Sequence, residues 1–155
     1  MKKIEIDTFL KFRFLSNPHF SPDGTKIAFT VSVPDRETNG YLSDLYLYDL
    51  GKKTVSRVTC SGDAKTWSWT AENTLIFTAA RTAALKKEKE NGTSFLYEIS
   101  PSGGEAQCIT SIPATVTGIR LLPDGRYLLT IRHDNYRDTR RKSYEVFDEL
   151  PFWGN

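Results

Sequence analysis

The sequence predicts an all-β fold, a partial β-propeller of about two and a half blades of antiparallel four-stranded meanders, with a short N-terminal helix. A turn followed by an apolar strand occurs three times, over Phe20–Thr30, Trp69–Thr78 and Leu121–Thr130. The step from Phe20 to Trp69 is 49 residues, and the step from Trp69 to Leu121 is 52. This period is typical of repeat units in which a few antiparallel strands form one blade.

A second set of landmarks agrees with the first. Leu45-Tyr46 followed by Val58-Thr59 returns as Leu96-Tyr97 followed by Ile109-Thr110, with one constant offset of 51 residues. The distance between the two strands is therefore the same in both units. Aromatic residues make up 12% of the chain, and they favour strands because their side chains suit a pleated, half-buried surface.

The composition is that of an ordinary globular chain without a strong charge bias. With 21 basic and 19 acidic residues among 155, the net charge of +2 gives no general attraction to nucleic acid or to an anionic membrane. Cys60 and Cys108 lack the spacing of a zinc or redox motif, so we assign no metal and no cofactor. The first residues lack the apolar core of a signal peptide, and no run approaches the ~20 apolar residues of a membrane helix. We therefore expect a cytoplasmic chain that contacts no membrane.

Residues 1–19 form a leading segment ahead of the first blade. The segment suits a short helix that Asp7 or Thr8 would cap and Asn17-Pro18 would end. Phe12 and Phe14 also fit the period of a strand, which stays open as the alternative. In either form the segment is apolar, so we expect it to dock on another surface.

Residues 20–66 are predicted to form blade one. The order Pro22-Asp23-Gly24 suits a tight turn, because proline presets φ, aspartate bonds to nearby backbone and glycine accepts a positive φ. A polar loop is expected over 34–40. Strands are expected over 26–33, 44–50 and 54–59.

Residues 67–117 are predicted to form blade two, in the same order. Trp67 and Trp69 lie two positions apart and therefore on one side of a strand. The charged tract Leu85–Gly92 is interpreted as a solvated hairpin tip or a frayed helical turn rather than as a binding site. Further strands are expected over 74–80, 94–100 and 105–110.

Residues 118–155 are predicted to start a third, truncated blade. The unit opens normally over 118–133, continues into a basic loop over 135–142, and stops after a strand-like stretch over 144–155. Each unit carries apolar residues on both faces of its strands, so a single blade cannot bury enough surface to offset its ordering entropy. We therefore expect the front part of a larger protein, or copies that self-associate through their open blade edges.

The repeat resembles that of the WD40-like propellers of the TolB and prolyl oligopeptidase type. The resemblance rests on the turn Ser21–Gly24 with its apolar strand, on Leu45–Asp49 and on the closing Val58-Thr59. The stretch Phe9–Pro18 and the tail Phe147–Trp153 are similar to the acylaminoacyl-peptidase and dipeptidyl-aminopeptidase branch of the prolyl oligopeptidase family (S9).

The resemblance implies a non-catalytic N-terminal propeller segment that gates the access of short peptides to a C-terminal α/β-hydrolase domain. In the family that domain supplies a Ser-Asp-His triad, and no GxSxG nucleophile elbow occurs in these 155 residues. We therefore assign no catalytic residue and expect the chain alone to be inactive, although the parent protein would be a serine peptidase. The alternative is a TolB-like binding or scaffold module with no enzymatic role.

The remaining polar residues are interpreted as structural. His19 and His133 have no motif partner for catalysis or metal binding. The adjacent carboxylates Asp148-Glu149 would point to opposite faces of a strand and could not easily share one substrate. Asp23 and Asp124 are expected to bond to the local backbone of their turns.

A nucleic-acid site is the other reading of the aromatic and basic residues. Trp67 with Trp69, or Tyr46 with Tyr48, could stack on bases, and the phosphate contacts would come from Arg137, Arg140, Arg141 and Lys142. However, the aromatic residues occupy positions that are apolar in the other units, which favours packing between blades. Acidic residues also interrupt the basic loop. We therefore expect no binding of nucleic acid.

Overall fold

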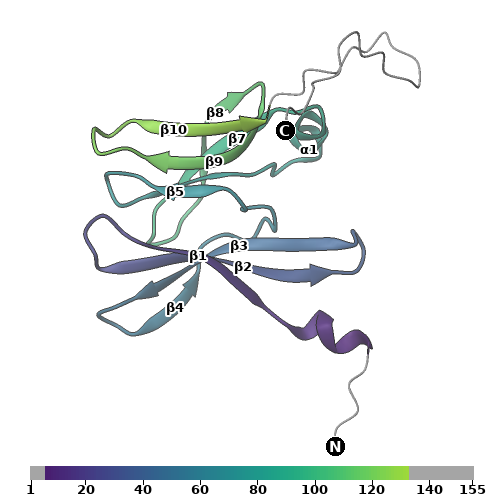
Figure 1. Cartoon of the computed structure of the whole chain (residues 1–155), viewed down its shortest axis with the longest axis horizontal. Coiled ribbons are helices and arrows are strands. Elements are labelled where there is room, and N and C mark those ends of the chain that lie inside the picture. Colours follow the sequence, from purple (N-terminus) through teal and green to yellow (C-terminus); the bar gives the residue numbers. More distant parts are fainter. Residues whose placement is uncertain (1–5, 133–155) are drawn as a thin grey trace, which may run out of the picture.

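The computed structural model describes residues 6–132 and contains three antiparallel sheets, two with four strands and one with two. The sheets are stacked in sequence order, with the second sheet between the first sheet and the two-stranded hairpin (Figure 1). Two complete meanders and the first half of another are thus present. The predicted all-β partial propeller is confirmed.

The first sheet is a continuous meander in the order β1-β2-β3-β4. The ladder between β2 and β3 runs out to Asp35 opposite Gly40, so the predicted loop over 34–40 is a short hairpin tip. Strand β1 comes from residues that the sequence analysis placed largely in the leading segment, and it pairs with β2. The strands are β1 (Phe14–Phe20), β2 (Lys26–Asp35), β3 (Gly40–Asp49) and β4 (Thr54–Arg57).

Asn17 marks the place where the leading segment departs from the predicted helix. Its φ of 51° is left-handed, and the register between β1 and β2 shifts between Ser16 and His19, which is a β-bulge. The Asn17-Pro18 pair, which was expected to end a helix, therefore bends a strand. The helix ahead of it is a single 3-10 element, η1 (Ile6–Lys11), with Asp7 in its first turn. Helix and strand, the two alternatives for this segment, both occur, one after the other.

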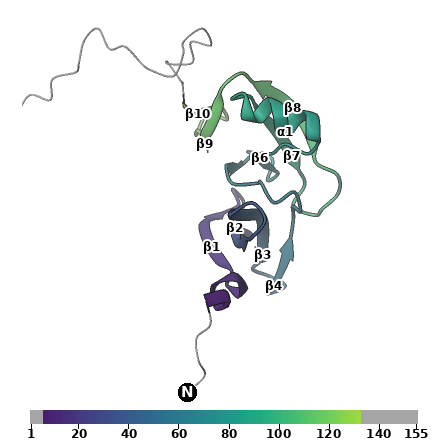
Figure 2. The ribbon, with the colours of Figure 1, turned by 90° about the vertical axis from the view of Figure 1, so that its right-hand side faces the viewer.

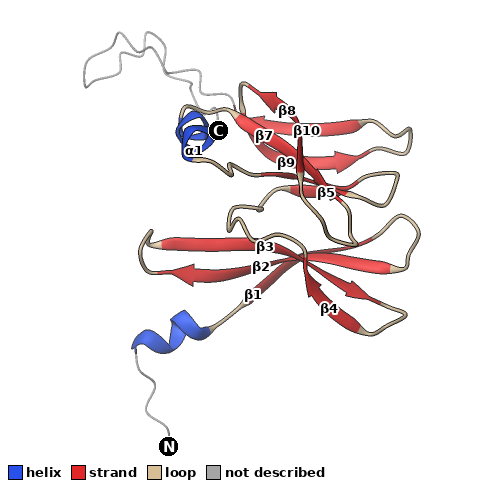
Figure 3. Ribbon diagram, turned by 180° about the vertical axis from the view of Figure 1, so that it is seen from behind, coloured by secondary structure: helices blue, strands red, loops and turns tan. Residues whose placement is uncertain are grey.

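The second sheet has the order β5-β6-β7-β8. The connection between β6 and β7 contains the α-helix α1 (Ala83–Glu90), seen in blue at the edge of the molecule in Figure 3. The Thr82 side chain caps this helix by accepting a hydrogen bond from the Leu85 N–H at 3.2 Å. The charged tract is therefore a capped helix with no buried residue. The strands are β5 (Trp67–Trp69), β6 (Leu75–Thr78), β7 (Ser94–Ile99) and β8 (Gln107–Ile112).

The third sheet is a hairpin of β9 (Thr115–Leu121) and β10 (Tyr127–Arg132). The basic loop and the tail Phe147–Trp153 lie outside the described residues. The three sheets begin at Phe14, Trp67 and Thr115. The domain boundaries 1–19, 20–66, 67–117 and 118–155 stay a prediction.

The repeated turn has the same geometry in all three units. The N–H of its fourth residue donates to the carbonyl of its first, from Gly24 to Ser21 at 2.8 Å, from Asn73 to Thr70 at 3.2 Å and from Gly125 to Leu122 at 3.0 Å. Each fourth residue has a positive φ: 71° at Gly24, 60° at Asn73 and 82° at Gly125. The first two turns also touch, because the Asp23 N–H donates to Asn73 Oδ1 at 3.1 Å.

The main core lies between the first and second sheets, which are seen edge-on in Figure 2. The Trp67 Nε1 donates to Thr30 Oγ1 at 2.9 Å, so the indole is fixed against the first sheet. The expected packing of Trp67 and Trp69 between blades is confirmed. The core residues of the two sheets are Ala28, Leu45, Leu47, Trp67, Trp69, Leu75, Phe77, Phe95, Tyr97 and Ile99.

The hairpin lies against the opposite face of the second sheet. Ile76 and Leu96 are buried on that face, and the Val116 N–H of β9 donates to Ser94 Oγ at 2.8 Å. Strand β5 also contacts β9. The second sheet is thus covered on both faces, as expected for an inner member of a stack.

Candidate functional site on the inner strands

The first strands of the three units lie side by side. Strand β5 contacts β9, and β1 is joined to β5 by the hydrogen bond from Trp69 Nε1 to the His19 carbonyl at 3.1 Å. In a propeller the blades surround a central channel, and one edge strand of each blade lines it. Because β1, β5 and β9 converge in this way, they correspond to the inner strands of their blades.

A pocket of about 450 Å³ opens on these strands, which is within the range of small-molecule sites. We call it the inner-strand pocket. Its lining comes from all three units: His19, Phe20 and Pro22, then Trp67, Ser68 and Trp69, then Ile119, Arg120 and Leu121. The repeat landmarks Phe20, Trp69 and Leu121 are all among them.

The two tryptophans form a fixed wall of the pocket. Both are buried, and each indole N–H already donates to the first unit. The His19 ring meets Trp67 edge to face, with centroids 5.7 Å apart and planes at 81°. His19 has no motif partner in the sequence, and the structure places it in this pocket beside an aromatic ring.

The polar groups of the pocket can bind but do not form a catalytic pair. Arg120 is exposed and brings a positive charge, while no carboxylate occurs among the lining residues. The Ser68 hydroxyl donates to the Trp69 carbonyl at 3.1 Å, and within the described residues it makes no hydrogen bond to the His19 ring. Such a surface suits an extended chain with carbonyl or carboxylate groups, held by donors and aromatic contacts.

The turn aspartates act on their own backbone, as predicted. Asp23 Oδ1 accepts from the Ser21 hydroxyl at 2.6 Å and from the Thr25 N–H at 3.0 Å. These bonds, that of Ser21 first, lower the pKa of Asp23 to about 2. Asp124 accepts from the side chain and the N–H of Arg126 at 2.8 and 3.1 Å, and the Arg126 side chain lowers the pKa of Asp124.

The other residues weighed in the sequence are not brought together. Cys60 and Cys108 are exposed free thiols. Tyr46 stacks on Phe29 on the face of the first sheet that points away from the tryptophans, so the two aromatic pairs form no common platform. The positions His133, Arg137, Arg140, Arg141, Lys142, Asp148 and Glu149 lie outside the described residues.

Sequence reasoning missed Arg120 and Ser68. Ser68 lies one residue before the landmark Trp69, and Arg120 lies one residue before the landmark Leu121. Each landmark directly precedes a copy of the repeated turn. Placing that position on the inner strand of each blade would have identified them. The spacing of the repeats therefore contained this signal, although it was interpreted only in terms of packing between blades.

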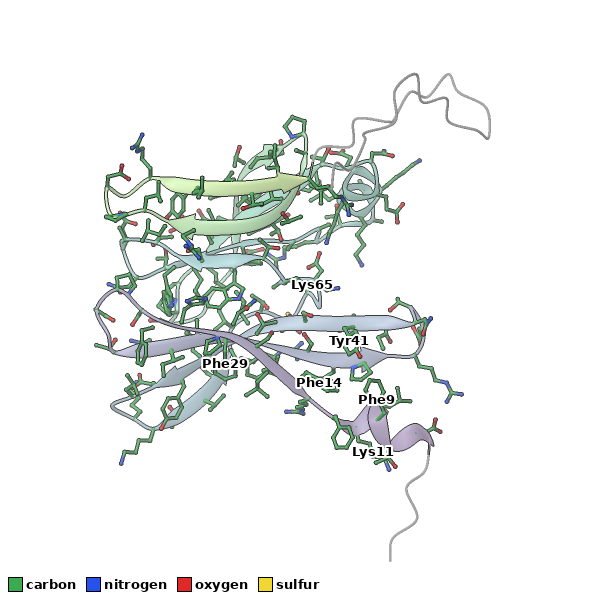
Figure 4. The ribbon with its side chains drawn as sticks, in the orientation of Figure 1. Phe9, Lys11, Phe14, Phe29, Tyr41 and Lys65 are labelled. Atoms are coloured by element: carbon green, nitrogen blue, oxygen red, sulfur yellow. The ribbon has the colours of Figure 1, made fainter. Side chains whose placement is uncertain are left out.

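A second surface lies where η1 meets β1 and β3. The rings of Phe9, Phe14 and Tyr41 turn toward one another (Figure 4), with centroid distances of 5.7, 6.4 and 5.9 Å. All three are exposed. We call these three residues the aromatic patch. Contiguous exposed apolar surface of this kind marks an interaction site.

Two other kinds of site have no candidate within residues 6–132. No group of three or more histidine, cysteine, aspartate or glutamate side chains is placed to hold a metal ion there. None of the helices in the same range has the length and apolar character needed to cross a bilayer.

Comparison with known proteins identifies peptidase relatives. No family model matches the chain. The uncharacterized peptidase YuxL of Bacillus subtilis (strain 168) is 29% identical over 94% of this chain. The match spans only 22% of YuxL, so the chain corresponds to about a fifth of that protein's length.

Solved structures give the same fold. The β-propeller domain of the Trilobed protease from Pyrococcus furiosus superposes with a TM-score of 0.56 at 17% identity, covering 79% of this chain and 35% of that one. An acylaminoacyl peptidase in complex with a chloromethyl ketone gives 0.64 at 18% identity, covering 96% and 21%. The acylaminoacyl peptidase of Pyrococcus horikoshii gives 0.67 at 17% identity, covering 95% and 21%. The resemblance to the propeller portion of S9 peptidases is confirmed.

Proposed function

We propose that this chain is the non-catalytic N-terminal propeller segment of a serine peptidase of the acylaminoacyl-peptidase type. In the intact protein it would form part of the channel that admits short peptides to a C-terminal α/β-hydrolase domain. The observation that carries the proposal is the convergence of β1, β5 and β9 on the inner-strand pocket. The sequence similarity to a peptidase also supports the proposal.

The size of the segment fits this role. The chain covers 35% of an isolated propeller domain and 22% of a peptidase relative. It therefore corresponds to about a third of a propeller and would leave room in the parent protein for the remaining blades and a catalytic domain. No GxSxG nucleophile elbow occurs in these 155 residues, and we assign hydrolysis to that other domain.

The aromatic patch is the surface that we assign to contact with the C-terminal domain. It lies where the leading segment meets β3, at the far end of the stack from the hairpin (Figure 4), and its rings are exposed. A domain attached to the same polypeptide would cover these side chains, so no separate partner protein would be needed. This agrees with the expectation that the leading segment docks on another surface.

The channel role can be tested in the full-length protein. Ser68→Trp would narrow the inner-strand pocket, while Ser102→Trp adds the same bulk to the exposed β7–β8 turn as a matched control. We expect Ser68→Trp to lower kcat/KM for an octapeptide at least about tenfold more than for an acetylated amino-acid ester, since only the longer substrate must thread the channel. Equal effects of both variants on both substrates would reject the channel role.

A simpler observation distinguishes the peptidase segment from the alternative, a TolB-like binding module. A serine-directed fluorophosphonate should label the full-length protein and should not label the 155-residue chain. Failure to label the full-length protein, together with no turnover of acylamino-acid substrates, would favour the binding module.

A further inference from the structure

A second cavity, of about 210 Å³, lies between the first and second units at their outer strands. One wall is the segment Val58–Ser61, which follows β4. The opposite wall includes Phe77 and Ile99, which belong to the face of the second sheet that packs against the first. We call it the outer-strand cavity, and it shares no lining residue with the inner-strand pocket.

One lining residue of the cavity carries a buried hydroxyl without a partner. Ser61 Oγ is inaccessible to solvent and makes no hydrogen bond within the described structure. Leaving a buried hydroxyl unsatisfied is unfavourable, and such groups are rare in native proteins. Rotation about χ1 of Ser61 would present this hydroxyl to a ligand oxygen in the cavity.

Two cations stand at the edge of the cavity. Arg81 Nη1 donates to the Ala106 carbonyl at 3.0 Å, and its guanidinium lies over the Tyr97 ring at 5.8 Å from the centroid. These contacts hold the planar group in place and leave other N–H groups of Arg81 for an anion. Lys86 of α1 contributes the second positive charge, and no carboxylate is among the lining residues in the described part of the chain.

Two carboxylates outside the lining have to be considered. Asp44 accepts from the hydroxyl of the lining residue Thr59 at 2.9 Å and pairs with Arg57 at 2.6 Å. The other is Asp63, whose Oδ2 accepts from the Ala80 N–H at 2.7 Å and from Lys89 Nζ of α1 at 3.1 Å, while its Oδ1 is buried without a hydrogen bond in the described structure. Asp63 does not line the cavity. Helix α1 therefore turns two lysines toward the interface between the units, one to Asp63 and one to the cavity.

We propose that the outer-strand cavity binds a small carboxylate with a short aliphatic stem. The carboxylate would take hydrogen bonds from Ser61 and Arg81 and the charge of Lys86, and the stem would rest on Phe77 and Ile99. The volume exceeds that of a single water but is smaller than drug-sized pockets, which limits the ligand to a few heavy atoms. The source is either a free small acid or an aspartate or glutamate side chain from another segment.

The test uses isobutyrate as the probe and isobutyramide as its uncharged isostere, with binding to the full chain measured by two-dimensional NMR titration. We expect isobutyrate to saturate and isobutyramide to bind at least about tenfold more weakly, because a charge-assisted bond is worth roughly 1.5–3 kcal/mol. N-acetylglutamate N-methylamide forms the second arm. Tighter binding of this mimic than of isobutyrate assigns the site to a protein side chain, and the reverse assigns it to a free acid.

Variants separate ligand contacts from structural effects. Lys86→Gln and Ser61→Ala should each weaken isobutyrate binding about threefold to tenfold, whereas Lys87→Gln, on the same helix but outside the cavity lining, should leave it unchanged. Arg81→Gln should have the largest effect, with the melting temperature as the check that the fold is kept. Equal binding of acid and amide, or equal loss in Lys86→Gln and Lys87→Gln, would overturn the proposal. Absence of saturable binding of all three probes would overturn it as well.

Discussion

The first and second sheets repeat the same stacked aromatic pair, but only one of the two pairs is covered. Phe77 stacks on Tyr97 with centroids 5.9 Å apart, and Phe29 stacks on Tyr46 at 6.0 Å. Phe77 and Tyr97 are 2% and 5% exposed, because the first sheet packs on them. Phe29 and Tyr46 are only half-buried, and they lie outside the core that the first and second sheets form.

The same contrast holds at the landmark positions. Trp69 is 5% exposed, while its repeat equivalent Phe20 is 63% exposed. Phe20 is paired with Ile27, and Ile27 with Tyr48, so these side chains share the face of Phe29 and Tyr46. The comparison shows that these aromatic residues are buried when the preceding unit packs on their sheet, and not by contacts within their own sheet. The equivalent face of the first sheet is suited to the same packing, but the described residues supply no sheet to cover it.

The largest expected effect compares the covered ring with the uncovered one. Phe77→Ala should lower the free energy of unfolding by about 3–5 kcal/mol, because it leaves a cavity in the core. Phe29→Ala, at the equivalent place on the uncovered face, should cost only about 1 kcal/mol. Urea denaturation of the two variants measures both values. Equal losses would mean that the two faces are equally covered in solution.

A second pair of variants compares the landmark positions. Trp69→Phe removes the N–H that reaches the His19 carbonyl, so it should cost about 1 kcal/mol in the free energy of unfolding. Phe20→Leu should change that free energy by less than about 0.5 kcal/mol. The comparison fails if Phe20→Leu proves the more damaging substitution in the same denaturation assay.

The uncovered face and edge also predict association of the isolated chain. Strand β4 is an edge strand of the first sheet. Its residue Val55 is exposed and lies opposite Tyr48 in the ladder between β3 and β4. Val55→Lys should shift sedimentation toward the monomer, because charge on an edge opposes strand pairing. Ser102→Lys, with the same charge in an exposed turn, serves as the control. A wild-type chain that sediments as a monomer at high concentration would remove the basis for this prediction.

The smallest expected effect concerns the repeated turn. The pKa of Asp23 is lowered from 3.8 to about 2 by its bonds in the folded state, so ionised Asp23 stabilises the fold above the unfolded-state pKa. This contribution should disappear as the pH falls from about 4 to about 2. Thermal melts of the wild type and of Asp23→Asn across this range should converge at the acidic end. A constant difference between the two would contradict the assignment to Asp23.

Much of the fold was predictable because it depends on short-range chemistry repeated at a fixed period. The turn residues, the alternation of the strands and the shared side of Trp67 and Trp69 are all local features, and the structure confirms them. A strand in the leading segment stayed open as the alternative to a helix, because the Asn17-Pro18 pair can end a helix or bend a strand. Only its pairing with β2 shows that it forms a bulge.

The sites were harder to predict because each joins residues that are far apart in the chain. The inner-strand pocket brings together residues near 20, 68 and 120, and the outer-strand cavity joins Ser61 to Arg81 and Ile99. The charged tract is a clear case. Its composition indicated a solvated hairpin tip or a frayed helical turn, and the structure shows a capped helix. The direction of Lys86 depends on where Thr82 caps that helix.

Asn73 occupies the place where the other two turns have glycine, and its side chain accepts the Asp23 N–H of the neighbouring turn. A glycine there would adopt the same left-handed conformation more easily, but it would offer no acceptor. The amide therefore links the turns of the first two units by a hydrogen bond that lies away from the hydrophobic core. Rotation from one blade to the next sets the curvature of a ring, so in the propeller that we propose this contact would constrain the diameter of the channel.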